Sequence, residues 1–392
     1  MRNQQTLVVV GNGMVGHRFL EKVVEYDVTK HFRVVTFCEE PRAAYDRVGL
    51  TSFFAHRDAE KLMIARRDWY EQNNIELHLG DRASSIDRKN QRVRSNKGIV
   101  IDYDKIVMAT GSYPFVPPMP GVTTRGVFVY RTIEDLQKII EYGKEAKSCA
   151  VIGGGLLGLE AAKAAYDLNL ETHVVEFANR LMPRQIDDAG SRILVDKIES
   201  LGVHVHLNCA TKEILGQSQV EQIAFTSGET LDVDMIIVSC GIRPRDDLAR
   251  DCSLDVGDRG GVLVDDLLQT SDPNIFAIGE VALHDGTVYG LVAPGYEMAQ
   301  IVAHNLVESI GRVEDSNNAD ETLASQLKFH GTALSAKLKL MGVDVASFGD
   351  YEAEESDAVA LTFEDPFGGS YKRLFFSRDG QHRLGGIRVG DA

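Results

Sequence analysis

The stretch TLVVVGNGMVG, residues 6–16, decides the fold of this chain. A run rich in β-branched residues, typical of a buried parallel strand, leads directly into a G-x-G-x-x-G turn formed by Gly11, Gly13 and Gly16. In such a turn the first glycine allows a tight bend, the second lets the backbone approach a pyrophosphate, and the third lets the next helix pack on the strand. Helical character follows over residues 17–26, and the free N–H groups at a helix N-terminus favour phosphate. The stretch therefore predicts a strand–turn–helix unit that binds a dinucleotide.

The same pattern occurs a second time in CAVIGGGLLG, residues 149–158. Its turn contains Gly153, Gly155 and Gly158, and a second helical stretch covers residues 159–168. A single G-x-G-x-x-G is a weak signal, because glycine also serves ordinary turns. Here strand, turn and helix recur in the same order, so the chain is predicted to hold two dinucleotide sites.

An acidic residue follows each unit at the end of its second strand. FRVVTFCEE presents Glu39 and ETHVVEF presents Glu176, where a carboxylate can accept hydrogen bonds from ribose hydroxyls. A carboxylate at this position accepts the 2′-hydroxyl of NADH but repels the 2′-phosphate of NADPH. The nearest following arginine is Arg180. Glu176 therefore predicts a preference for NADH.

Three further strands end in residues suited to a ligand. Residues 102–114 contain an apolar strand that ends in Ala-Thr-Gly, with Thr110 and Gly111, and residues 232–244 repeat this arrangement with Gly241. The later motif QTSDPNIFAIGE ends in Glu280. Ligands bind at such strand ends in open parallel sheets.

The motifs GNGMVG, ATG, GGGLLGLEAA and TSDPNIFAIGE resemble those of the pyridine nucleotide–disulfide oxidoreductase superfamily, flavoproteins with two dinucleotide-binding domains. The resemblance implies that the first turn binds FAD and the second binds a nicotinamide nucleotide. The FAD residues would be Gly11, Gly13, Gly16, Glu39, Tyr45, Arg47, Thr110, Gly111 and Glu280. The NAD residues would be Gly153, Gly155, Gly158, Glu160, Glu176 and Gly241. Glu280 stands where the superfamily usually has the shorter aspartate.

Residues 39–54, 128–136, 290–300 and 334–350 are similar to the N-terminal FAD/NADH-binding (diaphorase) module of the assimilatory NAD(P)H-dependent nitrite reductase large subunit. This resemblance implies an NADH:acceptor oxidoreductase that passes electrons from FAD to an iron–sulfur and sirohaem centre, where nitrite is reduced to ammonium. The chain has no cysteine clusters for such centres. Those centres are expected on further regions or on a partner subunit.

Hydride transfer between two cofactors needs no general base, so no obligate catalytic side chain is predicted. The resemblance places Glu160 near the nicotinamide; a first-turn acid that only favours the helix dipole is the alternative. It also makes Tyr45 and Arg47 flavin contacts, with solvated loop residues as the alternative. Ser52 stands where related ferredoxin reductases carry a lysine.

Composition excludes several other classes. The 42 Lys and Arg against 58 Asp and Glu give a net charge of −16, which argues against nucleic acid as a partner. No apolar run is long enough for a membrane span and no secretory signal is present, so a cytoplasmic location is expected. The five cysteines form no C-x-x-C, so no metal site and no thiol relay are predicted.

The predicted architecture is α/β, with two Rossmann-like domains and a small β-rich C-terminal domain. The FAD-binding domain is expected at residues 1–115 and 243–315, and the NAD(P)H-binding domain at 116–242. A polar linker at 311–322 would precede an interface domain at 323–392, and the resemblance also allows a homodimer.

Two other functions stay open. One is a ferredoxin- or rubredoxin-type reductase with a small soluble acceptor, although its expected P-x-L-S-K motif is missing. The other is an NADH-sensing flavoprotein without rapid turnover. Rapid bleaching of the bound flavin by NADH would distinguish either enzyme from the sensor.

Overall fold

The computed structural model describes residues 4–314, 326–332, 335–340, 343–351 and 358–390. Most of the predicted linker at 311–322 lies outside these ranges. The chain divides into two compact units, each built from three segments. The first comprises Met1–Arg47, Glu60–Tyr113 and Ile242–Thr332, and the second comprises Val48–Ala59, Pro114–Gly241 and Ala333–Ala392.

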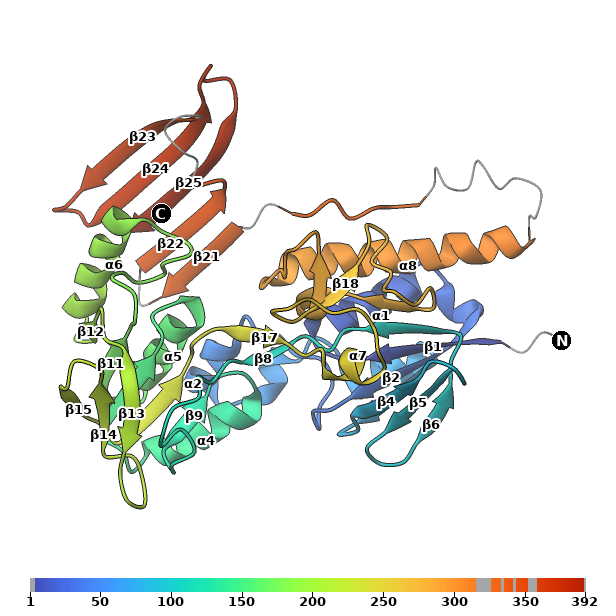
Figure 1. Ribbon diagram of the computed structural model, residues 1–392, viewed down its shortest axis with the longest axis horizontal. Coiled ribbons are helices and arrows are strands. Elements are labelled where there is room, and N and C mark those ends of the chain that lie inside the picture. The colour runs from blue at the N-terminus through green and yellow to red at the C-terminus, as the bar shows by residue number, and fades with distance from the viewer. Residues whose placement is uncertain (1–3, 315–325, 333–334, 341–342, 352–357, 391–392) are drawn as a thin grey trace. The chain divides into compact units, whose positions relative to one another are not determined.

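A five-stranded parallel sheet forms the centre of the first unit (Figure 1). Its central strand β1 is buried from Leu7 to Val10, as expected when helices or other layers cover both faces of a parallel sheet. The strand order is β19 (Ile275–Ala277), β7 (Lys105–Met108), β1 (Gln5–Val10), β2 (Phe32–Cys38), β3 (Ile75–Leu79).

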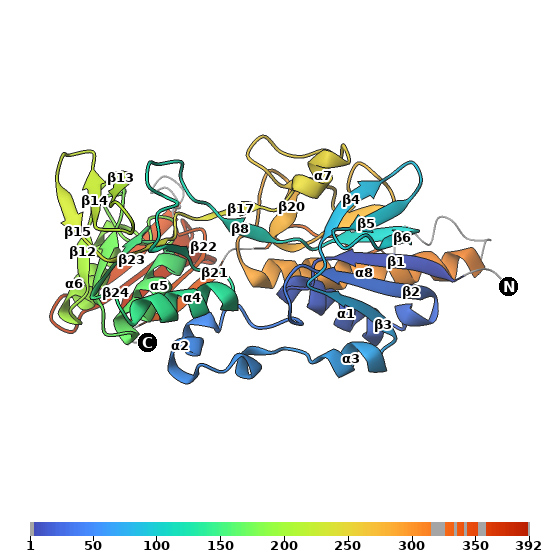
Figure 2. The ribbon, with the colours of Figure 1, turned by 90° about the horizontal axis from the view of Figure 1, so that it is seen from below.

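Helix α1 (Met14–Glu25) follows β1 and packs against α8 (Val292–Glu314) in the same unit (Figure 2). An antiparallel sheet of β4 (Ala83–Asp87), β5 (Arg92–Ser95) and β6 (Val100–Asp102) completes the larger elements. The smaller ones are η1 (Val28–Lys30), η3 (Ala59–Leu62), α3 (Arg67–Gln72), α7 (Asp247–Asp251), β18 (Val262–Val264), η4 (Gly279–Val281) and β20 (Ala282–His284). Strands β8 (Ser112–Pro114) and β17 (Ile242–Pro244) lie where the chain passes from one unit to the other.

The second unit repeats the arrangement with its own parallel sheet. The order is β12 (His204–His206), β11 (Glu171–Val175), β10 (Ser148–Ile152), β16 (Met235–Val238), β9 (Val127–Val129). Strand β10 holds the place of β1, since each leads into a glycine turn and pairs in parallel with the next strand of its βαβ unit. The duplication predicted from the sequence is thus present in the fold.

Helices α4 (Ile133–Gly143), α5 (Leu156–Asp167) and α6 (Asp188–Ser200) accompany this sheet. An antiparallel sheet of β13 (Thr211–Leu215), β14 (Gln222–Phe225) and β15 (Thr230–Asp232) extends the unit, and the segment 48–59 adds η2 (Leu50–Ser52) and α2 (Phe53–His56).

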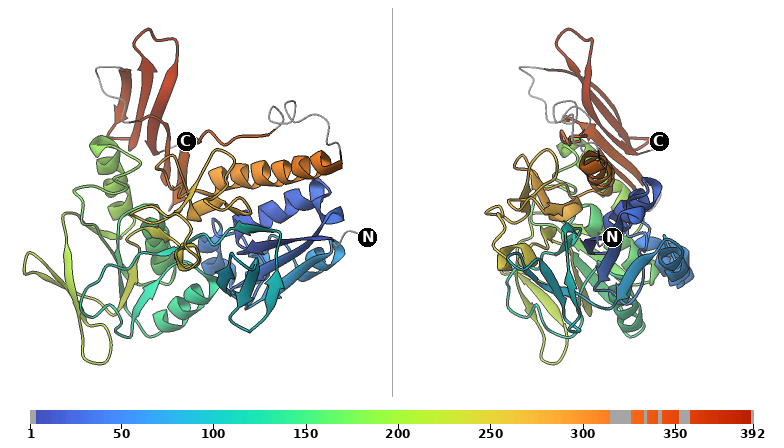
Figure 3. Two further views of the ribbon diagram at one scale, coloured as in Figure 1. Left: turned by 45° about the vertical axis from the view of Figure 1, so that its right-hand side comes forward. Right: turned by 90° about the vertical axis from the view of Figure 1, so that its right-hand side faces the viewer.

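The C-terminal part of the second unit is an antiparallel sheet, visible in red in Figure 3. Its order is β21 (Ser335–Leu340), β22 (Val343–Gly349), β25 (Arg383–Gly390), β24 (Ser370–Ser377), β23 (Ala358–Asp365). The sheet packs on α6, where a Cβ on Gly190 would lie 3.2 Å from Val389 and 3.3 Å from Tyr371. The predicted α/β class with a β-rich C-terminal domain is confirmed.

Candidate functional site

The first glycine turn joins β1 to α1 and leaves no room for side chains at two of its glycines. Gly11 has φ +107°, and a Cβ there would lie 2.3 Å from the carbonyl oxygen of Ala109. A Cβ on Gly16 would lie 2.2 Å from the carbonyl oxygen of Gly11. The end of β7 and the first turn of α1 therefore pack directly against the bend, which is the steric reason for the pattern.

The second turn, between β10 and α5, has nearly the same geometry. Gly153 has φ +113°, and its Cβ would lie 2.3 Å from the carbonyl oxygen of Ser239. A Cβ on Gly158 would lie 1.8 Å from the carbonyl oxygen of Gly153. Both turns therefore meet the same two steric requirements.

The middle glycines face open space instead. Around a Cβ on Gly155 no atom lies within 4 Å, and on Gly13 the nearest is Arg47 Nε at 4.0 Å. These glycines are the N-caps of α5 and α1, and neither provides a side-chain cap. The first N–H groups of each helix are thus available to an anion, so both turns fit a dinucleotide pyrophosphate.

The carboxylate of Glu176 is held beside the second turn by two backbone donors. Gly154 N–H donates to Glu176 Oε2 at 2.5 Å, and Ala178 N–H donates to Oε1 at 2.7 Å. Each oxygen retains lone pairs for ribose hydroxyls. The acid predicted for the nicotinamide nucleotide is therefore fixed near the turn that would bind its pyrophosphate.

The corresponding acid of the first unit, Glu39, pairs with a cation. Arg245, just beyond β17, donates from its guanidinium to the Glu39 carboxylate. The Arg245 carbonyl accepts a 2.7 Å hydrogen bond from the Thr110 hydroxyl. Arg245 thus brings together two predicted FAD residues that are far apart in sequence, and no local sequence pattern pointed to it.

Glu40, which sequence reasoning missed, organises the loop after β2. Tyr45 Oη donates to Glu40 Oε2 at 2.7 Å, and the Arg47 guanidinium donates to Glu40 Oε1 and lies 4.8 Å from the Tyr45 ring centre. Burial alone lowers the pKa of Arg47, but Glu40 outweighs this and raises the pKa. Two predicted flavin contacts therefore form one ordered cluster. The only available signal was the second acid of the Glu39–Glu40 pair.

Glu280 contacts the end of the Ala-Thr-Gly motif. Ser112 Oγ donates to Glu280 Oε2 at 2.5 Å, which joins the segment after β7 to η4. Gly111, the residue before Ser112, has φ +68°. The structure thus brings Gly111 and Glu280 to one end of the first sheet and adds Ser112, which the sequence did not single out.

Glu160 lies on the first turns of α5 and is only partly exposed. Burial raises the pKa of Glu160 to about 7, and no cation among the described residues offsets that effect. The nearby Tyr130 hydroxyl is 3.0 Å from Thr51 Oγ1, and the Tyr130 ring stacks on Phe54. The segment 48–59 therefore helps to enclose this carboxyl within the second unit.

Gly241, the last residue of the second unit's middle segment, has φ +100° and no atom within 4 Å of a built Cβ. Its carbonyl accepts a 2.8 Å hydrogen bond from Phe115 N–H. The position leaves an open backbone surface after β16, compatible with the predicted nucleotide contact.

Burial makes the five free cysteines poor nucleophiles. It raises the pKa of Cys38 to about 12 and that of Cys240 to about 11. The same cause raises the pKa of the other thiols, Cys149, Cys209 and Cys252. Because the thiolate is the reactive form, a raised pKa keeps these thiols largely unreactive at neutral pH.

Three histidines gather on β11 and β12. His173 Nδ1 lies 3.1 Å from His206 Nε2, and the His173 ring stacks on that of His204 at 4.9 Å. Burial lowers the pKa of His173 to about 4. Within the ranges that the structure describes, no group of three or more His, Cys, Asp or Glu is arranged to hold a metal ion.

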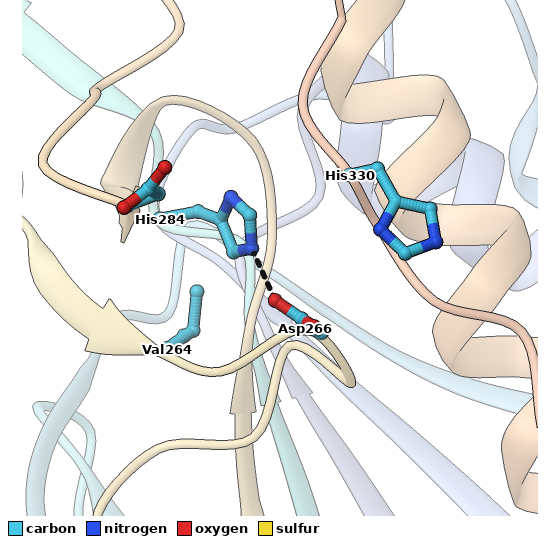
Figure 4. A pocket seen from close by; sticks show the side chains of 5 residues that line it. Val264, Asp266, His284 and His330 are labelled. Atoms are coloured by element: carbon cyan, nitrogen blue, oxygen red, sulfur yellow. Dashed lines mark hydrogen bonds and ion pairs between the residues drawn. The ribbon is translucent and has the colours of Figure 1, made fainter.

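A shallow cavity in the first unit is lined by residues outside both glycine turns (Figure 4). His284 Nε2 is 3.1 Å from Asp266 Oδ1, and His330 comes from the extended segment at 326–332. His284 Nδ1 has no hydrogen-bond partner but is sealed from solvent, so it does not face the open space. The cavity contains none of the predicted site residues.

No helix in the described part of the chain is long and apolar enough to cross a membrane.

Two family models match the sequence. The model described as "Pyridine nucleotide-disulphide oxidoreductase" matches residues 5–308, and that described as "Rubredoxin NAD+ reductase C-terminal domain" matches residues 335–392.

The chain is also similar in sequence to curated relatives and in fold to solved structures. The chain is 47% identical over 387 residues to the nitrite reductase (NADH) large subunit of Escherichia coli, covering 98% of this chain and 44% of the relative. It is 34% identical over 386 residues to the assimilatory nitrate reductase electron transfer subunit of Bacillus subtilis, covering 98% and 47%. It thus spans less than half the length of these relatives. An NAD-dependent persulfide reductase from A. fulgidus shares the fold, with a TM-score of 0.86 at 22% identity over 98% of this chain and 74% of that one.

Proposed function

Since the chain belongs to the pyridine nucleotide-disulphide oxidoreductase family, we propose that it is an FAD-dependent NADH oxidoreductase that supplies electrons for nitrite reduction. The observation that carries the proposal is the pair of matching glycine turns, each with two sterically required glycines and one open glycine. Two dinucleotides in one chain allow one to pass electrons to the other.

The first unit is assigned to FAD. Its glycine turn would bind the pyrophosphate of FAD, and Glu39 would accept hydrogen bonds from the ribose hydroxyls. The segments that end in Gly111 and Glu280 would contact the flavin part. The Glu40–Tyr45–Arg47 cluster supports a flavin contact, because its side chains are already held in place. Residues 1–115 and 243–315 are proposed as the FAD-binding domain, 116–242 as the NAD(P)H-binding domain, and 323–392 as a C-terminal interface domain.

The second turn and Glu176 are assigned to NADH. When bound, the two cofactors supply hydride transfer between the nicotinamide and the flavin ring. The chain's own residues would bind and orient the cofactors and would exclude water from them. Glu160 is proposed to lie near the nicotinamide, where burial raises the pKa of its carboxyl to about 7 and the protonated form can donate a hydrogen bond.

NADH is proposed over NADPH because of the way Glu176 is held. The two backbone donors keep its carboxylate beside the turn, so it cannot swing away from a 2′-phosphate without losing both hydrogen bonds. Repulsion of that phosphate then adds to the lost ribose hydrogen bond.

An iron–sulfur or sirohaem centre on another region or subunit is proposed as the electron acceptor. The names of the relatives support this, since one is a nitrite reductase large subunit and another an electron transfer subunit. The raised pKa values of the cysteines argue against a thiol as the next electron carrier. A cytoplasmic location remains part of the proposal.

The test is anaerobic stopped-flow reduction of the FAD-loaded chain by NADH, followed by a panel of acceptors. We expect NADH to bleach the flavin within the time of one turnover, and to do so faster than NADPH. Reoxidation by a sirohaem- and iron–sulfur-containing nitrite reductase domain should then yield ammonium. A flavin that NADH reduces only over minutes would refute the enzymatic proposal and favour the sensor.

A rubredoxin-type reductase is the second candidate. The family model that matches residues 335–392 favours it, as does 31% identity over 309 residues to the rubredoxin-NAD(+) reductase of Pseudomonas putida, covering 76% of this chain and 79% of that one. Rubredoxin belongs in the acceptor panel for this reason. Faster reoxidation by rubredoxin than by the nitrite reductase domain would favour this alternative.

A further inference from the structure

A buried chain of hydrogen bonds connects the first glycine turn to a residue far along the sequence. Asn12, between the first two glycines of the turn, has its side chain directed into the protein and is 5% exposed. It meets Tyr70, on α3, whose side chain is fully buried. The third member is His17, on the first turns of α1.

Both ends of the Asn12 amide contact the Tyr70 hydroxyl. Asn12 Nδ2 donates to Tyr70 Oη at 3.0 Å, and Asn12 Oδ1 lies 3.2 Å from the same oxygen. Tyr70 Oη also lies 3.0 Å from His17 Nδ1, so the one phenol proton is donated either to Asn12 Oδ1 or to Nδ1 of a neutral His17. One hydroxyl thus ties the turn to the helix that begins at the turn.

The surroundings favour this neutral arrangement. Burial lowers the pKa of His17 and raises the pKa of Tyr70 to about 12, so both groups are uncharged at neutral pH. Trp69, the one tryptophan of the sequence, packs edge-on against His17 at 4.7 Å between ring centres. Glu21 Oε1 lies 3.7 Å from His17 Nε2, and Arg18 is the other charged group that acts on the ring.

We propose that Tyr70 is a positioning residue for FAD, which fixes the diphosphate-binding turn through its hydrogen bond to the Asn12 side chain. The inference rests on the proposed assignment of FAD to the first turn. Gly11 and Gly13 have no side chain, so between them only Asn12 can reach the interior with a side chain, in addition to the backbone hydrogen bond from Gly11 N–H to the Phe37 carbonyl. Holding that side chain reduces the conformational entropy that the turn loses when a ligand orders it.

The second turn offers an internal comparison. It has Gly154 in the place of Asn12, so no side chain can anchor it in this way. There Gly154 N–H instead donates to Glu176. The anchor is thus specific to the turn proposed for FAD.

The test compares Tyr70→Phe with Tyr103→Phe in the full chain. Tyr103 is a buried tyrosine of the same hydrophobic core, and its hydroxyl bonds neither Asn12 nor His17. Each protein is stripped of FAD and titrated with FAD, with Trp69 emission and flavin fluorescence as readouts, and the Tm of each apoprotein is measured. Removing one partner of a buried hydrogen bond should raise the FAD dissociation constant of Tyr70→Phe about tenfold, with no comparable change in Tyr103→Phe.

A purely structural role would lower the Tm of the Tyr70→Phe apoprotein and leave its FAD dissociation constant within twofold of the parent, which would overturn the proposal. Failure of the parent to bind FAD would refute the proposed function instead.

A double-mutant cycle tests the route of the effect. If Tyr70 acts through Asn12, Tyr70→Phe should weaken FAD binding much less in an Asn12→Ser background than in the parent. Equal, additive losses would show that Tyr70 acts by another path and would also overturn the proposal.

Discussion

Replacing Glu160 by glutamine should make the protein more stable at alkaline pH without a similar gain under acidic conditions. The carboxyl lies on α5 in the second unit, and burial without an offsetting cation raises its pKa from the usual 4.5 to about 7. A folded-state pKa above the unfolded one means that the unfolded chain releases this proton first. Stability is therefore lost as the pH rises from about 4.5 to about 7, and then stays level.

The pKa difference sets the size of the effect. Each pKa unit corresponds to 1.36 kcal/mol, so ionised Glu160 costs the folded state about 3 kcal/mol above pH 7. Part of this cost is already present at pH 5, because the unfolded carboxyl has begun to ionise. Between pH 5 and pH 8 the difference in unfolding free energy, Glu160→Gln minus parent, should increase by about 2.5 kcal/mol.

Urea unfolding followed by far-UV circular dichroism at pH 5, 6, 7 and 8, at constant ionic strength, measures this difference. Glu221→Gln is the matched control, because Glu221 is an exposed acid of the same unit. Its difference from the parent should stay flat over the same range. A flat difference for Glu160→Gln as well would refute the reasoning, since it would mean that the carboxyl ionises as it does in the unfolded chain.

Four other substitutions test nucleotide binding or stability. Glu176→Ala should weaken NADH binding about tenfold and raise the NADPH:NADH ratio of kcat/KM. Glu171→Ala, at the start of the strand that Glu176 follows, should do neither. Gly155→Ala should keep the parental Tm but weaken NADH binding, because the added methyl group extends into open space where the pyrophosphate would bind. Gly158→Ala should lower the unfolding free energy by about 4 kcal/mol, because its Cβ would lie 1.8 Å from the carbonyl oxygen of Gly153. Asp187→Ala removes the N-cap of α6 and the acceptor for Tyr371 and Arg373, and should destabilise the second unit by about 2 kcal/mol in thermal unfolding.

The features that depend on neighbours in the chain were predictable from the sequence. The two βαβ units, their glycine turns and the acids that follow them are encoded within about 30 residues each, because the turn, helix and strand obey local rules. The antiparallel C-terminal sheet was also predictable, since Gly368-Gly369 and Asp379-Gly380 are turn signals between its last three strands.

The interactions that complete the sites could not be predicted from the sequence, because they join residues that are far apart in the chain. Ser112 meets Glu280 across 168 residues, Arg245 meets Glu39 across 206, and Tyr70 meets Asn12 across 58. No local propensity specifies such a contact, because it depends on which strand ends the sheet order brings together. The grouping of Val48–Ala59 with the second unit is of the same kind, since this segment lies within the range predicted for FAD.

The two acids that follow the turns differ in a way that suits different ligands. Glu176 is held by two backbone N–H groups of its own unit's turn and strand end, so its carboxylate is in place before any nucleotide arrives. Glu39 instead pairs with the long, flexible side chain of Arg245 and is about half exposed. A substrate that must bind and leave at every turnover benefits from a preformed site, because no side chain has to be ordered each time. A resident cofactor binds once, so a slow rearrangement of one arginine does not limit the turnover rate. The rigid acid thus fits NADH and the adaptable acid fits FAD, in agreement with the assignment made from the order of the motifs.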